Sequence, residues 1–170
     1  MNDLKWRFLD DVYLTNAMSD ALRRSCTYSD DAKDSDKEQC RNELKSALSE
    51  IARRYQHVVD EQQHIDNIHG LKTRISQRCK TTLRGGTLRF GVAQKAVNVY
   101  LKYLWCAGAI PIPPHCTFDD TIIGKLKLPS NCSTTWTMTD SQQDYDQWVS
   151  AAKVLAGAEP LAAWELRVWS

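Results

Sequence analysis

The chain has 170 residues, of which 42% are hydrophobic and 25% are charged, and its formal net charge is +1. That length is enough to bury one sizeable core, so we expect a single domain. No apolar run approaches the roughly 18 residues that a membrane span needs, and the first ten residues mix charged with apolar side chains, unlike a signal peptide. We therefore expect a soluble cytoplasmic protein with no membrane partner.

Apolar residues recur at helical spacing in the first part of the chain. In residues 3–22 the stripe runs from Leu4 and Phe8 to Ala17, which predicts an amphipathic helix. A capping-box pattern at Ser35–Glu38 opens a second stripe that continues to Gly70, either as one long helix or as two helices with a kink.

The central part of the chain predicts two more helices. One is short and ends at Gly85–Gly86, and the next runs from about Val92 to Cys106 with Val97 and Leu104 on its buried stripe. We expect this second helix to stop at Gly108.

The segment Ile110–Pro114 contains three prolines, which remove backbone donors and fix φ. It is therefore expected to be extended. Cap patterns at Thr117–Asp120 and Thr139–Gln142 predict a short helix through Leu128 and a longer helix after it.

Pro160 suits the first turn of a last helix, which ends at Trp169. No strand-like alternation or internal repeat is present, so we expect an all-α fold, a compact bundle of about seven helices. We divide it into N-terminal helices (1–84), a central segment (85–128) and C-terminal helices (129–170).

Charge is unevenly distributed along the chain. Residues 1–66 hold 14 acids and 10 bases, residues 119–170 hold 7 acids and 4 bases, and residues 67–118 hold 8 bases and no acid. A basic stretch of this kind is typical of a surface that faces nucleic-acid phosphates, because each neutralised phosphate releases counterions. The alternative is a chance cluster on a solvated face. We expect double-stranded DNA as the partner.

Within this stretch, residues 89–99 read RFGVAQKAVNV. This resembles the hairpin-to-helix signature of the helix-hairpin-helix DNA glycosylase superfamily, in which Gly-Val-Gly-x-Lys-x-Ala opens a helix. Ala93 stands where the family has its second glycine. The lysine is the nucleophile in bifunctional members, so the resemblance implies that Lys95 is catalytic.

Downstream, residues 111–119 read PIPPHCTFD. They resemble the family's Pro-Val-Asp-type segment, and especially the Pro-Ile-Pro of the archaeal oxoguanine glycosylases, although five residues separate Pro113 from the aspartate. The resemblance covers about residues 85–128 and implies a catalytic Asp119 or Asp120. We prefer Asp119, because it follows the apolar Phe118 as the family's aspartate follows an apolar residue. The family's four-cysteine iron–sulfur motif is absent, so no cluster is implied.

Two further sets of residues are assigned from the charge pattern and the resemblance. The residues expected to contact DNA are Lys80, Arg84, Arg89, Gly91, Gln94 and Lys102. The residues expected to line a pocket for an extruded base are Trp105, His115, Phe118 and Trp164.

The expected function is a DNA glycosylase, with or without lyase activity, that flips and excises an oxidised purine or a phage-type modified cytosine. The residues leave open a non-catalytic helical DNA-binding protein and an interaction protein associated with phage or defence. We expect a monomer that acts on nucleoid DNA and needs no small-molecule cofactor. We also expect no metal, since the histidines and the six cysteines lack metal-ligand spacing, and the cysteines are expected to be reduced thiols.

Overall fold

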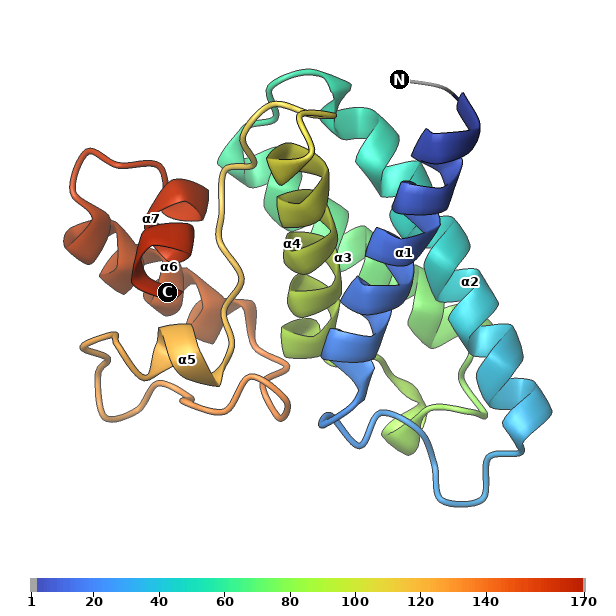
Figure 1. Ribbon diagram of the computed structural model, residues 1–170. Coiled ribbons are helices and arrows are strands. Elements are labelled where there is room, and N and C mark those ends of the chain that lie inside the picture. Colours follow the sequence, from blue (N-terminus) through green and yellow to red (C-terminus); the bar gives the residue numbers. More distant parts are fainter. Residues whose placement is uncertain (1–2, 170) are drawn as a thin grey trace.

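Seven α-helices and two short 3₁₀ helices account for most of residues 3–169, which are the residues that the computed structural model describes (Figure 1). The helices are α1 (Asp3–Leu22), α2 (Asp34–Arg53), η1 (Arg54–Gln56), α3 (Glu61–Arg78), η2 (Arg84–Gly86), α4 (Phe90–Cys106), α5 (Asp120–Ile123), α6 (Gln142–Ala156) and α7 (Leu161–Trp169). Within these residues there is no β-strand, only one antiparallel bridge between Tyr28 and Leu83. The predicted all-α class and helix number are confirmed.

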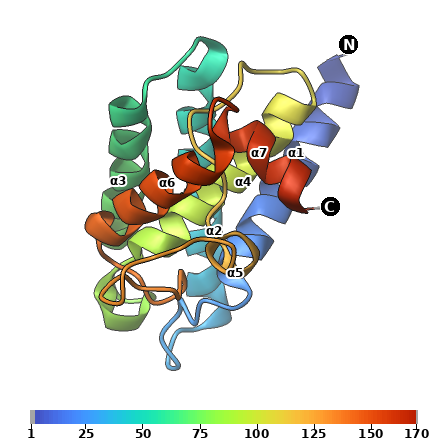
Figure 2. The ribbon, with the colours of Figure 1, turned by 90° about the vertical axis from the view of Figure 1, so that its left-hand side faces the viewer.

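Helix α4 forms the centre of the molecule. Twelve of its 17 residues are buried, which is a far larger share than the single buried stripe of a surface helix. Helices α1, α2 and α3 pack on one side of α4, and α6 and α7 lie across its other side (Figures 1 and 2). The predicted stripe of Val97 and Leu104 is buried as expected, but so is most of the rest of the helix.

The predicted helix up to Gly70 is two helices, α2 and α3, joined by η1 and an extended link. Asp60 caps α3, because its side chain accepts a hydrogen bond from Gln63 N at 2.8 Å. Gly70 lies inside α3 and does not end it. Packing of α3 against α2 and α4 thus offsets the modest helix penalty of one glycine.

Other boundaries also differ from the sequence prediction. Helix α2 begins before Ser35, with Lys33 at its N-cap position and no side-chain cap. Helix α5 ends at Ile123 and does not reach Leu128. On α1, Leu4 and Phe8 are exposed, and the buried face consists of Leu14, Ala17, Met18 and Ala21. None of the helices among residues 3–169 is both long and apolar enough to cross a membrane.

Candidate active site

The start of α4 is fixed by a segment that comes from much later in the chain. The N–H of Phe90 donates to the Asp140 carboxylate at 2.9 Å, and the N–H of Gly91 donates to the carbonyl of Thr139 at 2.9 Å. These bonds satisfy donors that a helix start leaves free. They also place Lys95, one turn further on, at the edge of this buried region.

After α4, the chain turns at Gly108, which has a φ of +72°, and then runs back along α4 as the extended segment that the prolines predict (Figure 1). Two buried amide side chains of α4 hold this segment. Asn98 Nδ2 donates to the carbonyl of Cys116 at 2.8 Å, and Gln94 Nε2 donates to the carbonyl of Phe118 at 2.7 Å. Because the segment runs antiparallel to α4, its end returns to the helix start.

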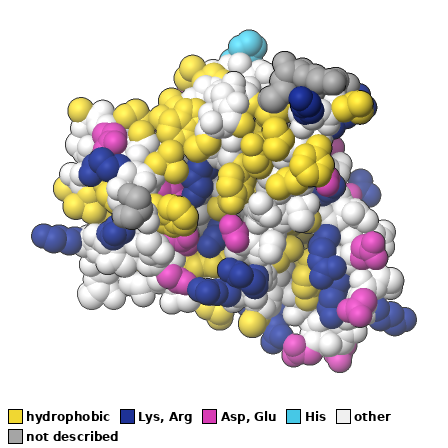
Figure 3. All heavy atoms as spheres, in the orientation of Figure 1, with side chains coloured by type: hydrophobic (Ala, Val, Ile, Leu, Met, Phe, Trp, Pro, Cys, Tyr) yellow, Lys and Arg dark blue, Asp and Glu magenta, His cyan; other side chains and the backbone are white. Residues whose placement is uncertain are grey.

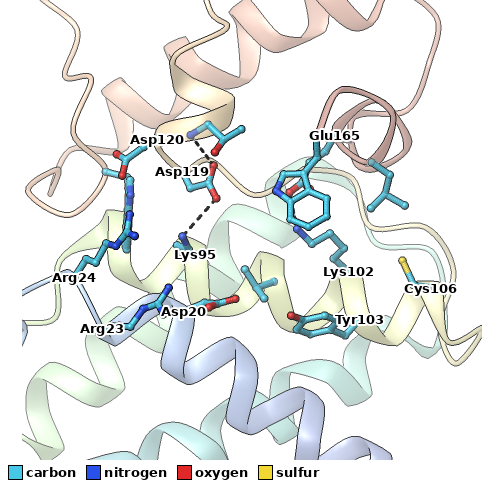
Figure 4. Close-up of a pocket in the computed structure, with 15 residues that line it drawn as sticks. Asp20, Arg23, Arg24, Lys95, Lys102, Tyr103, Cys106, Asp119, Asp120 and Glu165 are labelled. Carbon is cyan, nitrogen blue, oxygen red and sulfur yellow. Dashed lines mark hydrogen bonds and ion pairs between the residues drawn. The ribbon is translucent and has the colours of Figure 1, made fainter.

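This return brings Asp119 to Lys95, 24 residues earlier in the chain. Asp119 is the N-cap of α5, and its Oδ1 accepts from the N–H groups of Thr121 and Ile122 at 3.1 and 3.2 Å. The second oxygen, Oδ2, is then free to face Lys95 Nζ at 3.5 Å (Figure 4). Asp120 makes no such contact, so the geometry favours Asp119 as the partner of Lys95.

Lys95 and Asp119 open into a pocket of about 350 Å³, which is within the usual range for small-ligand sites. Lys95 Nζ lies 4.4 Å from the centre of the Trp136 ring, in a cation–π contact. The side chains of Lys95 and Asp119 are only 12% and 24% exposed. The pocket is lined by Asp20, Arg23, Arg24, Lys95, Val99, Lys102, Tyr103, Cys106, Asp119, Asp120, Thr121, Trp136, Glu165, Leu166 and Trp169.

A second lysine and carboxylate form another part of the pocket wall. Lys102 Nζ lies 2.6 Å from Glu165 Oε1, and Glu165 Oε2 accepts from the N–H of Thr117 at 3.0 Å. Glu165 is only 2% exposed, and both of its carboxylate oxygens are bonded within the protein. Sequence reasoning missed Glu165, although an acid beside Trp164 on an apolar helix is a signal that could have identified it.

The predicted DNA-binding residues are not grouped on one open surface. Gln94 is buried in the bonds described above, and Arg89 donates to the carbonyls of Ser25 and Thr137 at 3.0 and 2.9 Å. Arg84 pairs with Asp30. Of the six predicted DNA-binding residues, only Lys80 is exposed and has no charged partner among the residues that the structure describes.

Gly91 also has a different environment from the one that the resemblance implies. A Cβ atom added to it would lie 1.8 Å from the carbonyl oxygen of Trp136. The glycine therefore permits close approach of the chain's own backbone, and this approach covers the surface that a DNA phosphate would need.

The predicted base-pocket residues are placed elsewhere too, and this corrects the assignment. Phe118 and Trp164 are buried in the core, and Trp105 is half-buried outside the pocket lining. His115 is 1% exposed and shares a 2.8 Å hydrogen bond between its Nδ1 and Tyr145 Oη. Burial lowers the pKa of His115 to about 3. The aromatic residues that line the pocket are instead Tyr103, Trp136 and Trp169.

No group of three or more His, Cys, Asp or Glu side chains within residues 3–169 is arranged to hold a metal ion. The six cysteine thiols are unpaired. Comparison with known proteins finds no significant match to any protein-family model, curated protein or solved structure. The function therefore has to be inferred from the chemistry of the pocket.

Proposed function

We propose that the chain is a DNA glycosylase, of helix-hairpin-helix type, that takes an extruded nucleotide into this pocket and cleaves its N-glycosidic bond. One observation carries the proposal: Lys95 Nζ and Asp119 Oδ2 lie 3.5 Å apart in a pocket, joined by the antiparallel return of the proline segment. A nucleophile with a proton acceptor in reach is the arrangement that covalent catalysis requires. The motif resemblance over residues 85–128 supplies the class of reaction.

The chemistry follows from these two groups. Asp119 Oδ2 accepts a proton from the Lys95 ammonium, and the resulting amine attacks C1′ of the sugar. The C1′–N bond breaks with its electron pair on the base, which leaves after taking up the proton held by Asp119. The lysine nitrogen, now bonded to C1′, still carries two protons. One of them passes to O4′ as the C1′–O4′ bond breaks and the sugar ring opens, and the nitrogen, which keeps the other, forms the C=N bond of a protonated Schiff base with C1′.

Trp136 contributes to the same reaction. Its ring faces Lys95 Nζ at 4.4 Å, so the negative π face lies where positive charge is held before the reaction. The same face would stabilise the positive charge that develops on the sugar and on the iminium nitrogen. The half-buried setting of Lys95 limits competing water.

Borohydride trapping on a duplex with an abasic site tests the nucleophile directly. The wild-type protein should give a stable covalent adduct, because borohydride reduces the Schiff base to an amine. Lys95→Gln keeps a hydrogen-bond donor toward Asp119 and has no nucleophilic amine, so it should give none. An undiminished adduct in this variant would refute the assignment of Lys95.

The acid is tested with neighbouring variants in single-turnover assays. Asp119→Asn should slow base release by orders of magnitude, while Asp120→Asn, the matched control, should not. Duplexes with oxoguanine, uracil, hydroxymethylcytosine and its glucosylated form should be assayed for strand scission after alkali. Release of none of these bases by folded, DNA-binding protein would contradict the proposal and favour a non-catalytic DNA-binding protein.

A further inference from the structure

Two consecutive arginines at the mouth of the pocket have no side-chain partner among residues 3–169. Arg23 and Arg24 follow the end of α1, are exposed and line the pocket, yet neither side chain makes an ion pair or hydrogen bond with any described residue. Figure 4 shows both on the same side of the pocket as Lys95. In Figure 3, basic side chains lie on the lower half of the face where α1 ends, with acidic side chains among them. Arginine is suited to such a site, since its guanidinium donates to two phosphate oxygens at once.

The other basic residues near the pocket are already neutralised. Lys95 and Lys102 are paired with Asp119 and Glu165, as described above. Lys72 Nζ, near the start of α4, lies 2.6 Å from Asp140 Oδ1. The acid-free stretch thus receives its counter-charges from other parts of the chain, and few of its cations remain for a phosphate.

The backbone at the start of α4 is also closed to DNA. Its first N–H groups donate to the Asp140 carboxylate and to the carbonyl of Thr139, so a phosphate would have to displace these acceptors to bind there. The backbone donors that the helix-hairpin-helix resemblance implies as phosphate contacts are therefore in use.

The segment that carries the arginine pair is anchored on both sides. Ser25 Oγ donates to the carbonyl of Leu22 at 3.1 Å, and Arg89 donates to the carbonyl of Ser25 at 3.0 Å. The carbonyl of Thr27 accepts from the N–H of Arg84 at 2.9 Å. Arg89 and Arg84, which the sequence assigns to DNA, thus hold the segment on which the free arginines stand.

We infer that Arg23 and Arg24 bind the DNA phosphates beside the extruded nucleotide, in place of the backbone of the hairpin that precedes α4. The inference rests on the proposed function in taking DNA as the substrate. Two nearby acids, Asp20 and Asp120, also line the pocket and oppose the phosphate charge. Replacing the half-buried carboxylate of Asp20 by an amide should therefore strengthen DNA binding.

The test measures DNA affinity as a function of salt concentration, with an undamaged duplex as the probe. Arg23→Ala/Arg24→Ala should lower the slope of log K against log salt by about 1.8, since each phosphate contact contributes about 0.9. At 0.15 M salt this corresponds to an affinity loss of roughly 30-fold. The control is Arg53→Ala/Arg54→Ala, an equal loss of charge at the end of α2, which lies at the opposite end of the bundle from the end of α1 (Figure 1).

The control should keep the wild-type slope, and Asp20→Asn should bind several-fold more tightly. Equal losses for the two arginine pairs, or an unchanged slope for Arg23→Ala/Arg24→Ala, would overturn the inference. So would wild-type binding that does not depend on salt. A slope that depends on Arg23 and Arg24 in a protein that gives no adduct and releases no base would support the DNA contact and refute the glycosylase.

Discussion

Replacing Gly91 with alanine distinguishes two roles for this glycine. In the structure it permits close approach of the Trp136 backbone, whereas the motif suggests contact with a DNA phosphate. The added Cβ would lie 1.8 Å from Trp136 O, 2.9 Å from Trp136 C and 3.3 Å from Thr139 O. An ordinary carbon–oxygen contact is about 3.3–3.6 Å, so the Trp136 backbone has to move by roughly 1.5 Å. The clashing atoms belong to the backbone and not to the end of a flexible side chain, so the clash is relieved only if the segment that contains Trp136 shifts.

The shift has a cost that the structure allows us to estimate. Overpacking of this kind costs about 1–3 kcal/mol, and loss of the Gly91 N–H bond to Thr139 O adds about 0.5–1.5 kcal/mol. Weakening of the Arg89 bond to the carbonyl of Thr137 adds a similar amount. We therefore expect Gly91→Ala to lower the free energy of unfolding by about 2–6 kcal/mol.

Urea unfolding followed by tryptophan fluorescence measures this change. The matched control is Gly70→Ala, because nothing lies within 4 Å of a Cβ at Gly70 and its φ is helical. There alanine should stabilise the protein by about 0.5–1 kcal/mol. A Gly91→Ala protein with wild-type stability and lost DNA affinity would refute our reasoning and restore a DNA contact for this glycine.

Two further predictions concern buried charge. Burial lowers the pKa of His115 to about 3, and burial together with His115 lowers that of His64 well below its usual 6.5. Between pH 6.5 and pH 3 only the unfolded chain takes up these protons. The free energy of unfolding should therefore be highest above about pH 6.5 and fall toward pH 3, by about 1.4 kcal/mol per pH unit for each histidine. Urea unfolding of His115→Asn should show a shallower fall of this free energy with pH, and a fall equal to that of the wild type would contradict the prediction. Lys102→Met leaves the Glu165 carboxylate buried and unpaired, and should cost roughly 3–5 kcal/mol. Lys102→Met/Glu165→Gln should recover most of that loss in the same assay, and a double variant as unstable as the single one would show that the ion pair is not the cause.

The sequence by itself determined the local features of the site. Helical spacing located α4, because apolar residues such as Val97 and Leu104 recur at the period of a helix, whereas the burial of most of its other residues was not predicted by that spacing. The prolines required the segment after Ile110 to be extended, since each fixes φ and removes a donor. The residue type at Asp119 determined its role as a cap, because its carboxylate can accept the first free N–H groups of a helix. These features depend on neighbours within a few residues.

Only the tertiary structure decided which surfaces stay free. Charge counted along the chain predicts a basic DNA face, but ion pairs form in space, and Asp140, Asp30 and Glu165 come from outside the acid-free stretch to neutralise it. The same holds for the pocket walls: Trp136 lines the pocket while Phe118 does not, because this depends on how the returning segment packs against α4. Local spacing carries no information on contacts between residues that are far apart in the chain, and the meeting of Lys95 with Asp119 is such a contact.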